Sequence, residues 1–297
     1  MKKNQLVEAQ VFKKNIIFCL QFIGPIFSYA SDLDTNFLKP QHPYNLSYLY
    51  DIFYDKDHHG TMDIDFYLLK AAEIGSEILE VGCGTGRILI PLVQMGKQVD
   101  GLDPDAKRLD FLRFKLSKIG IKQKEQVHLY PITLTEFETG KLYDGIFFPF
   151  RVFQHFYNFE EQQENLLISK RLLNENGIII LDVFFTNFDQ FHQNTKKLFL
   201  HQSINDLNKN LHINKSYYKN SINPEEQYFT GYWVYHIYEG SRLLEEIIEP
   251  LGPMYCYSYL ELLKLFDSCG LKVLEEWGGF DGSSIGEGGE MIFVLQR

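Results

Sequence analysis

The stretch from Ile78 to Arg87 constrains the fold more than any other part of the chain. A short apolar run ends at Val81 and leads into glycines at alternate positions, Gly82, Gly84 and Gly86. Because glycine has no Cβ atom and tolerates positive φ, such a turn lets the backbone come close to a ligand. A helical pattern follows, and the free N–H groups at a helix start favour polar ligands. The stretch predicts a strand, a ligand-binding turn and a helix.

The spacing of the glycines narrows the kind of ligand. It is G-x-G-x-G, whereas a dinucleotide site uses G-x-G-x-x-G and a P-loop ends in Gly-Lys-Ser/Thr. Asp103 ends the next apolar run, and a carboxylate at that place can accept hydrogen bonds from both hydroxyls of a ribose. We therefore expect an adenosine-like ligand that is neither a dinucleotide nor a nucleoside triphosphate.

From about residue 44, apolar runs alternate with helical patterns. The expected strands are 78–81, 98–103, 127–130, 143–148 and 178–183, and the expected helices are 63–72, 88–95, 106–119 and 160–173. The patterns at 143–148 and 178–183 are almost wholly apolar, which is typical of parallel strands covered by helices on both faces. The order predicts an α/β fold with a doubly wound, mostly parallel sheet.

Residues 205–250 break this rhythm. Three runs at 211–219, 227–238 and 242–249 resemble successive strands with polar turns between them, which predicts an inserted antiparallel sheet. The insertion is rich in Tyr and Trp, so we expect it to cover a small-molecule substrate in a mostly apolar pocket. A helix at 259–269 and strands at 271–275 and 291–295 are expected to follow.

Composition excludes several classes of protein. Hydrophobic residues make up 45% and charged residues 23%, so neither disorder nor a fibrous repeat dominates. The formal charge of −10 disfavours nucleic acid as a partner. The four cysteines form no CxxC pair and are interpreted as free thiols of a reducing compartment. His58-His59 lacks a third ligand at a convincing spacing, so no metal site is expected.

Residues 1–43 are interpreted as an N-terminal extension. Residues 1–30 have the order of a secretory signal: basic residues, an apolar run from Ile16 to Phe27, and a small-residue exit at Ser28-Tyr29-Ala30. Gln21 interrupts the run, which is also shorter than the about 20 apolar residues of a membrane span. We expect a cytoplasmic protein without a stable membrane span, and export is the alternative.

The sequence resembles the class I S-adenosylmethionine-dependent methyltransferases. The resemblance is carried by ILEVGCGTGRILIPL at Ile78–Leu92, GLDPDA at Gly101–Ala106, LYDGIFFPFRVFQHF at Leu142–Phe156, and the stretch Leu172–Val183. It covers residues 44–297. It implies a seven-stranded sheet in the order 3-2-1-4-5-7-6, with the seventh strand antiparallel, and S-adenosylmethionine as the cofactor.

The resemblance also implies roles for individual residues. Glu80 and the three glycines, Gly82, Gly84 and Gly86, would hold the methionine portion of the cofactor, and Asp103 would hold its ribose. The local interpretation of the glycine turn and of Asp103 agrees with these roles.

Three further positions carry over from the family. Thr133 and Leu134 stand where family members often have Asp and an apolar residue at the adenine, and Phe150 begins the stretch beside the sulfonium and the acceptor. Thr133 is a departure, because its hydroxyl can hydrogen-bond the adenine amino group without a charge. Candidate catalytic residues are His155 and Tyr54, although either side chain could simply pack in the fold.

The resulting hypothesis is methyl transfer to an N or O atom of a small molecule by in-line displacement. Phe148-Pro149-Phe150-Arg151 differs from the Asn/Asp-Pro-Pro-aromatic sequence of methyltransferases that act on DNA bases. Two alternatives remain, a non-catalytic S-adenosylmethionine-binding protein and an aminopropyltransferase of the same fold. The second is disfavoured because residues 149–158 contain no acid to hold a polyamine.

Overall fold

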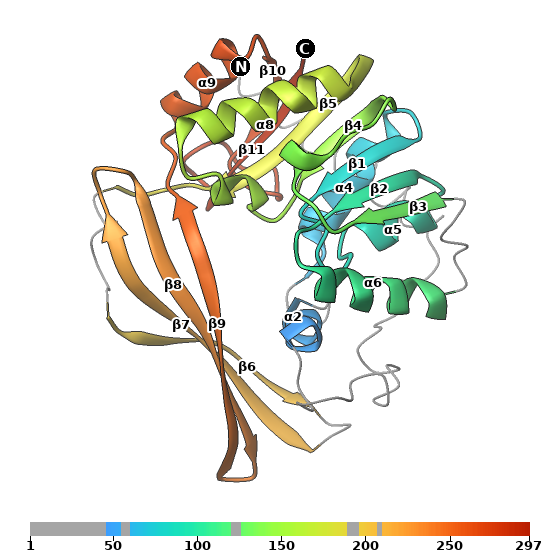
Figure 1. The fold of residues 1–297 in the computed structure, drawn as a ribbon. Helices are drawn as coiled ribbons and strands as arrows, with labels where there is room; N and C mark the ends of the chain where they lie inside the picture. Colours follow the sequence, from blue (N-terminus) through green and yellow to red (C-terminus); the bar gives the residue numbers. More distant parts are fainter. Residues whose placement is uncertain (1–45, 55–59, 120–125, 189–195, 207–209) are drawn as a thin grey trace.

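The chain forms two sheets of different kinds in the computed structural model, which describes residues 46–54, 60–119, 126–188, 196–206 and 210–297. One is a seven-stranded sheet flanked by helices, and the other is a four-stranded antiparallel sheet (Figure 1). The predicted extension 1–43 and the pair His58-His59 lie outside the described residues.

The seven-stranded sheet has the order β10-β11-β5-β4-β1-β2-β3. Its strands are β1 (Glu77–Val81), β2 (Gln98–Leu102), β3 (Val127–Tyr130), β4 (Tyr143–Phe148), β5 (Leu173–Phe184), β10 (Lys272–Trp277) and β11 (Glu290–Gln296). β1 to β5 pair in parallel, whereas β11 runs antiparallel to both β5 and β10. Numbered along the chain within this sheet, the order is 3-2-1-4-5-7-6 with the seventh strand antiparallel, so the predicted fold class is confirmed.

Helices cover both faces of this sheet. One face carries α4 (Met62–Ala72), α5 (Leu89–Gln94) and α6 (Ala106–Lys118), and the other carries α8 (Phe159–Leu172) and α9 (Tyr259–Ser268). Successive side chains of β5 pack against opposite helix layers. Ile180 packs with α4–α6, whereas Ile179 and Leu181 pack with α8 and α9. Every position of such a strand meets apolar neighbours, which is why its sequence shows no alternation.

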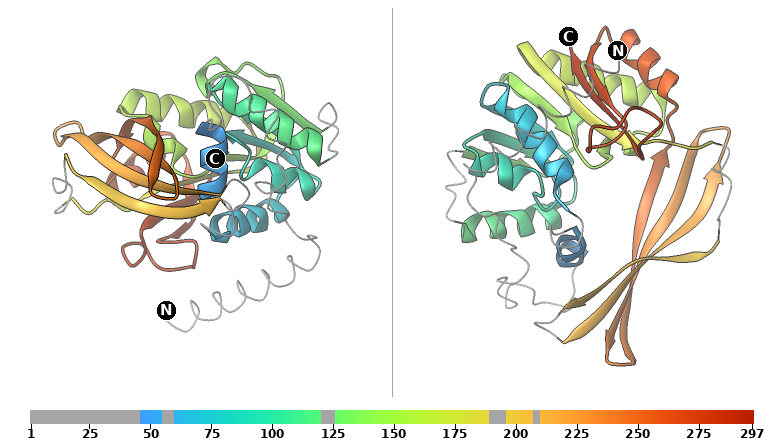
Figure 2. Two further views of the ribbon diagram at one scale, coloured as in Figure 1. Left: turned by 90° about the horizontal axis from the view of Figure 1, so that it is seen from below. Right: turned by 180° about the vertical axis from the view of Figure 1, so that it is seen from behind.

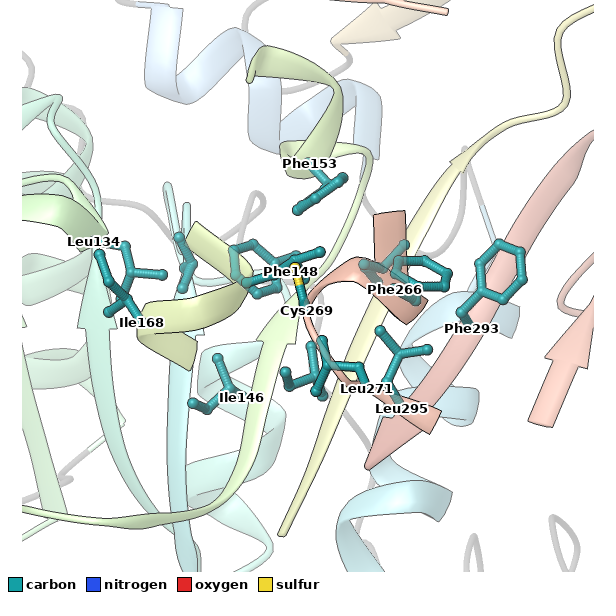
Figure 3. Close-up of a cluster of buried hydrophobic side chains, with 14 of the residues drawn as sticks. Leu134, Ile146, Phe148, Phe153, Ile168, Phe266, Cys269, Leu271, Phe293 and Leu295 are labelled. Atoms are coloured by element: carbon teal, nitrogen blue, oxygen red, sulfur yellow. The ribbon is translucent and has the colours of Figure 1, made fainter. Parts of the chain in front are cut away.

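Phenylalanine rings lie among aliphatic side chains in the layer under α8 and α9 (Figure 3). The rings of Phe266 and Phe293 meet edge to face with centroids 5.1 Å apart, and Phe148 and Phe153 do so at 5.7 Å. Phe153 belongs to a short 3₁₀ helix, η3 (Val152–His155), that follows β4. Burial of Phe153 therefore anchors the segment that leaves the carboxyl end of β4.

The start of β5 differs from the sequence prediction. A turn at 174–177 was expected before a strand at 178, but β5 already begins at Leu173. Leu173 pairs with Tyr143 and Ile178 with Gly145, so the residues between them bulge out of the ladder. The Asn174 side-chain amide donates a 2.7 Å hydrogen bond to the carboxylate of Asp144, which holds the bulge against β4.

The second sheet is a four-stranded antiparallel meander. Its strands are β6 (Leu198–Asp206), β7 (Leu211–Asn223), β8 (Tyr228–Glu239) and β9 (Arg242–Tyr255), hydrogen-bonded in chain order. Sequence analysis missed β6. Its first residues are exposed on both faces, Leu198 at 49% and Leu200 at 64% on one and Phe199 at 38% on the other, so no buried face imposes an alternating pattern.

The helix α2 (Leu46–Tyr54) fills the space between this second sheet and α6 (Figures 1 and 2). Phe53 is fully buried there, with its ring 5.8 Å from the ring of Tyr235 on β8. Phe111 of α6 and Ile213 of β7 belong to the same apolar cluster. This apolar cluster holds the second sheet so that one of its faces points toward the carboxyl ends of β1, β2 and β4.

We predict that Phe266→Ala lowers the free energy of unfolding by about 3–5 kcal/mol, because it leaves a cavity under α9 in a closely packed layer. Leu260→Ala is the matched control, since Leu260 lies on the same helix but is 65% exposed. Urea denaturation of both variants measures the difference. Equal midpoints would show that the α9 layer is not part of the core.

Candidate functional site

A cavity of about 1110 Å³ lies between the two sheets. One wall is formed by the glycine turn after β1 and the segments that follow β2, β3 and β4, and the opposite wall by β6 to β9. α2 and α6 contribute to its side. The volume exceeds the ~300–1,000 Å³ usual for one small-molecule site, so the cavity has room for two reacting molecules.

The three positions of the turn require glycine for different reasons. All have positive φ: 70° at Gly82, 51° at Gly84 and 86° at Gly86. A Cβ atom on Gly82 would come within 2.5 Å of Val152, and one on Gly86 would overlap Leu112. A Cβ on Gly84 would meet only Asp103, at 3.8 Å. Gly82 and Gly86 are thus required by packing, whereas the Cβ position of Gly84 is open. Gly82 and Gly84 both line the cavity, and Gly86 is absent from its wall.

Asp103 joins the ends of β1 and β2. Its Oδ2 accepts a 2.8 Å hydrogen bond from the N–H of Gly84, and its Oδ1 accepts one of 2.8 Å from the N–H of Asp105. Burial raises the pKa of Asp103, while the two backbone N–H groups and Arg108 oppose that rise. The carboxylate therefore holds the glycine turn in place and still lines the cavity.

Glu80 is the least satisfied polar group of this wall. It is 1% exposed, and its Oε2 has no hydrogen-bond partner among the residues that the structure describes. Burial, and then the negative charge of Asp103, raises the pKa of Glu80 well above its usual range. A cationic or hydrogen-bond-donating group in the cavity would satisfy this carboxyl.

Thr133 and Leu134 line the cavity after β3. Thr133 is the N-cap of a short 3₁₀ helix, η2 (Leu134–Glu136), and its hydroxyl donates a 2.8 Å hydrogen bond to the carboxylate of Glu136. The proton of the Thr133 hydroxyl is thus engaged in a hydrogen bond within the turn, and the Thr133 oxygen acts as an acceptor. Leu134 is 2% exposed and forms part of the core beneath the wall.

The segment after β4 has an unusual backbone. Phe150 and Arg151 both have positive φ, 56° and 66°, which is uncommon for residues with side chains. Their N–H groups donate to the two oxygens of Asp182, at 2.9 and 3.0 Å, and the hydroxyl of Tyr67 donates to Oδ1 at 2.6 Å. The buried carboxylate on β5 therefore holds the strained turn that carries Phe150 into the cavity.

Tyr54, at the end of α2, meets this turn from the other side. Its ring lies edge to face with Phe150, with centroids 4.8 Å apart. The Nζ of Lys215 on β7 lies 2.7 Å from the Tyr54 hydroxyl and donates a hydrogen bond to it. Burial raises the pKa of Tyr54 to about 12, so its hydroxyl keeps its proton at neutral pH. Both residues line the cavity.

His155 lies at the end of η3 on the same cavity wall as Phe150. Its side chain is exposed at the cavity opening. The recessed surroundings, and then the positive charge of Arg108, lower the pKa of His155, so the imidazole is neutral at pH 7. Tyr54 and His155 thus approach the same space from α2 and η3.

Sequence analysis missed four residues of this region: Asp182, Lys215, Arg108 and Glu249. Two of them had a usable signal. Asp182 is the one acid in the apolar run 178–183, and Lys215 falls on the same face of β7 as the buried Leu211 and Ile213. A charged residue at a buried strand position points to a specific partner. Arg108 and Glu249, which form a 2.7 Å ion pair across the cavity side, had no such signal.

The described residues include no group of three His, Cys, Asp or Glu side chains placed to hold a metal ion. Cys83, Cys256 and Cys269 are buried free thiols. Within the same described parts, no helix is both long and apolar enough to cross a membrane.

Residues 79–179 match the family model of a methyltransferase domain. This stretch runs from β1 into β5 and contains the glycine turn, Asp103, Thr133 and the strained turn after β4. No curated protein matches the sequence.

Solved structures show the same fold at low sequence identity. The methyltransferase CcbJ from Streptomyces caelestis is 18% identical with a TM-score of 0.67, over 80% of this chain and 89% of that one. An S-adenosylmethionine-dependent methyltransferase from Clostridium acetobutylicum is 14% identical with a TM-score of 0.69, over 85% and 99%. CalS10, an amino pentose methyltransferase from Micromonospora echinaspora, is 15% identical with a TM-score of 0.64, over 87% and 100%. Residues 79–179 are thus similar to a methyltransferase domain, and the strand order shows the fold that class I S-adenosylmethionine-dependent methyltransferases have.

Proposed function

We propose that the protein transfers a methyl group from S-adenosylmethionine to an N or O atom of a small molecule held under the four-stranded sheet. The observation that carries this proposal is the unpartnered carboxyl of Glu80 beside Asp103, in a cavity that continues beneath a second, aromatic wall. Two ligands of different character can thus be bound side by side, which is what a transfer between two substrates requires.

The first wall suits the cofactor. Glu80 would receive the ammonium group of the methionine portion, Asp103 the ribose hydroxyls, and Leu134 an adenine face, with the oxygen of Thr133 as an acceptor. Gly84 leaves the space that a bound ligand needs, since its nearest neighbour would be Asp103. When bound, S-adenosylmethionine supplies a methyl group already activated by the sulfonium. The task of the protein is then to position the acceptor and remove its proton.

The second wall suits a small acceptor with a ring or other flat surface. Phe199, Tyr217, Phe229 and Trp233 of β6 to β8 line it, with Lys215 among them. The hydroxyl of Tyr217 is buried and has no hydrogen-bond partner among the described residues, so it can recognise a polar group of the acceptor. Amino sugars, which combine a ring with a nucleophilic nitrogen, and phenols are the acceptor classes we would test first. Nucleic acid is disfavoured by the net charge of −10.

Two alternatives differ in their chemistry. A non-catalytic protein would bind the cofactor without consuming it. An aminopropyltransferase would need acids for a polyamine, and although residues 149–158 contain none, Glu161 and Glu164 of α8 line the cavity. The experiment below therefore includes the substrate of that reaction.

We place the protein in the cytoplasm, because S-adenosylmethionine is made and kept inside the cell. Fractionation of cells that express the full-length chain tests this. Recovery outside the cytoplasm, with an N-terminus at Ser31, would show that residues 1–30 act as an export signal.

The function is tested on the full-length protein by calorimetry with S-adenosylmethionine, then by incubation with a panel of amino sugars and phenols. Formation of S-adenosylhomocysteine together with a product heavier by one methyl group supports the proposal. Binding without turnover indicates the non-catalytic alternative. Consumption of decarboxylated S-adenosylmethionine with a polyamine indicates aminopropyl transfer, and absence of binding to both cofactors overturns all three.

We predict that Gly84→Val abolishes S-adenosylmethionine binding, because the branched side chain would enter the cavity from a backbone with φ of 51°. Gly96→Val is the matched control. Gly96 also has positive φ and open space around its Cβ position, but it lies outside the cavity wall. Both variants carry backbone strain of order 1–3 kcal/mol, so only the binding heat separates them. Equal affinity in the two variants would place the cofactor elsewhere.

Asp103→Ala should weaken the binding of S-adenosylmethionine by roughly 10- to 100-fold, because a charged acceptor of a buried hydrogen bond contributes about 1.5–3 kcal/mol. Part of this loss of affinity comes from removing the hydrogen bond that Asp103 accepts from the N–H of Gly84. Asp105→Ala is the control, since that neighbouring acid caps α6 outside the cavity wall. Calorimetry measures the dissociation constant of S-adenosylmethionine for each variant. An equal loss of affinity in both variants would contradict a specific contact between Asp103 and the ribose.

A further inference from the structure

Lys215 differs from the other buried lysines among the described residues. Lys70 and Lys115 are also less than a tenth exposed, but each forms an ion pair with a carboxylate, Lys70 with Glu275 and Lys115 with Asp51. Lys215 is 1% exposed, and in the described part of the chain no carboxylate lies within ion-pair distance of it. Its hydrogen-bond partner is the hydroxyl of Tyr54.

Aromatic rings surround the Lys215 amine. The Nζ atom lies 4.0 Å from the ring centres of Tyr54 and Trp233, 5.6 Å from that of Phe53 and 5.8 Å from that of Tyr235. The ring faces attract a cation, but they cannot replace the hydrogen bonds that an ammonium group makes to water. Loss of hydration therefore outweighs the attraction, and a neutral amine is favoured.

Charged and titratable groups face Lys215 from every surrounding element. They are Tyr54 of α2, Arg108 of α6, His201 of β6, Tyr235 of β8 and Glu249 of β9. Arg151, after β4, acts on Tyr54 and His201 in turn. Glu249 is already engaged, because it accepts hydrogen bonds from Arg108 at 2.7 Å and from Tyr235 at 3.0 Å. Burial lowers the pKa of Lys215 to about 7, with Glu249 opposing the shift and Arg108 adding to it.

We propose that Lys215 takes up, through the Tyr54 hydroxyl, the proton that the methyl acceptor loses. The inference rests on the proposed methyl transfer. Tyr54 contacts Phe150 on the cofactor side and Lys215 on the acceptor side, so it stands between the two walls of the cavity. In this proposal Tyr54 touches the acceptor. Lys215 acts through Tyr54: it holds the Tyr54 hydroxyl in position and takes up its proton.

The step balances without a further reactant. When Lys215 is neutral, its lone pair can accept the hydrogen bond of the Tyr54 O–H across the same 2.7 Å contact. The O–H or N–H bond of the acceptor then breaks, and its proton passes to the Tyr54 oxygen while the Tyr54 proton passes to Lys215 Nζ. The freed electron pair of the acceptor forms the bond to the methyl carbon, and the electron pair of the S–CH₃ bond returns to sulfur. Lys215 ends as an ammonium among the rings, and the proton leaves to solvent when the products depart.

The protonation state of Lys215 is measured without any ligand. Full-length protein labelled with ¹³C at lysine Cε is titrated by NMR. We expect one lysine signal to titrate near pH 7, several units below the about 10.4 of an ordinary lysine. That signal should vanish in Lys215→Met, whose side chain fits an apolar cage, and persist in Lys70→Met. A signal that persists in Lys215→Met, or the absence of any near-neutral lysine, overturns the inference.

The catalytic part is measured by the pH dependence of kcat/KM, with the amino sugar or phenol that turns over. A base must be unprotonated, so the wild-type rate should rise with pH through about 7 and then level off. Lys215→Met, Lys215→Arg and Tyr54→Phe should lose this rise and fall by roughly 10²-fold or more, because a guanidinium does not deprotonate and a phenyl ring cannot relay a proton. Lys70→Met should keep the wild-type profile.

His155 is the competing base, and its lowered pKa would place the rise below about 6.5. A profile that changes in His155→Gln and not in Lys215→Met overturns the inference while leaving the proposed function intact. Wild-type protein that turns over no acceptor of the panel would instead count against the proposed function, and with it this role of Lys215. The two failures are therefore distinguishable.

Discussion

The carboxylate of Asp182 holds together the parts of the molecule on which the site depends. It is buried near the carboxyl end of β5 and accepts hydrogen bonds from the backbone of Phe150 and Arg151 and from the hydroxyl of Tyr67. A buried carboxylate is costly unless its oxygens are satisfied, and three donors from α4 and the end of β4 satisfy it here. The same bonds keep two residues with side chains in a backbone conformation that they rarely adopt.

The consequences reach the glycine turn. Because the chain turns sharply after β4, Val152 comes to lie against Gly82, where no Cβ atom would fit. Phe153 is pulled into the core under α8 and α9, and Phe150 is left facing the cavity. One hydrogen-bonded carboxylate thus sets the relative position of the turns after β1 and β4, which together form the first wall of the site.

The elements of the core could be predicted from the sequence because each follows from a local pattern. The continuous apolar runs of β4 and β5 indicate strands covered on both faces, and the glycine turn with Asp103 indicates a ligand-binding edge. The features that were missed depend on distant partners. Lys215 meets Tyr54 across 161 positions and Asp182 meets Tyr67 across 115. The sequence can mark both as charged residues at buried strand positions, but it does not show which partner each of them meets. β6 lacks a sequence signal for another reason: it pairs with β7, but its exposed first half has no buried face that would require alternating apolar residues.

The division of the cavity between two sheets has a thermodynamic consequence. The four-stranded sheet is a separate hydrogen-bonded unit, and the apolar cluster around α2 is a principal contact that holds it over the strand ends. A ligand that touches both walls adds contacts that exist only while the sheets face each other, so it favours that arrangement by its differential affinity. A second ligand then meets a sheet that is already positioned. By linkage the benefit is mutual: two ligands that each touch both walls tighten the binding of one another by the same factor, even where they share no direct contact.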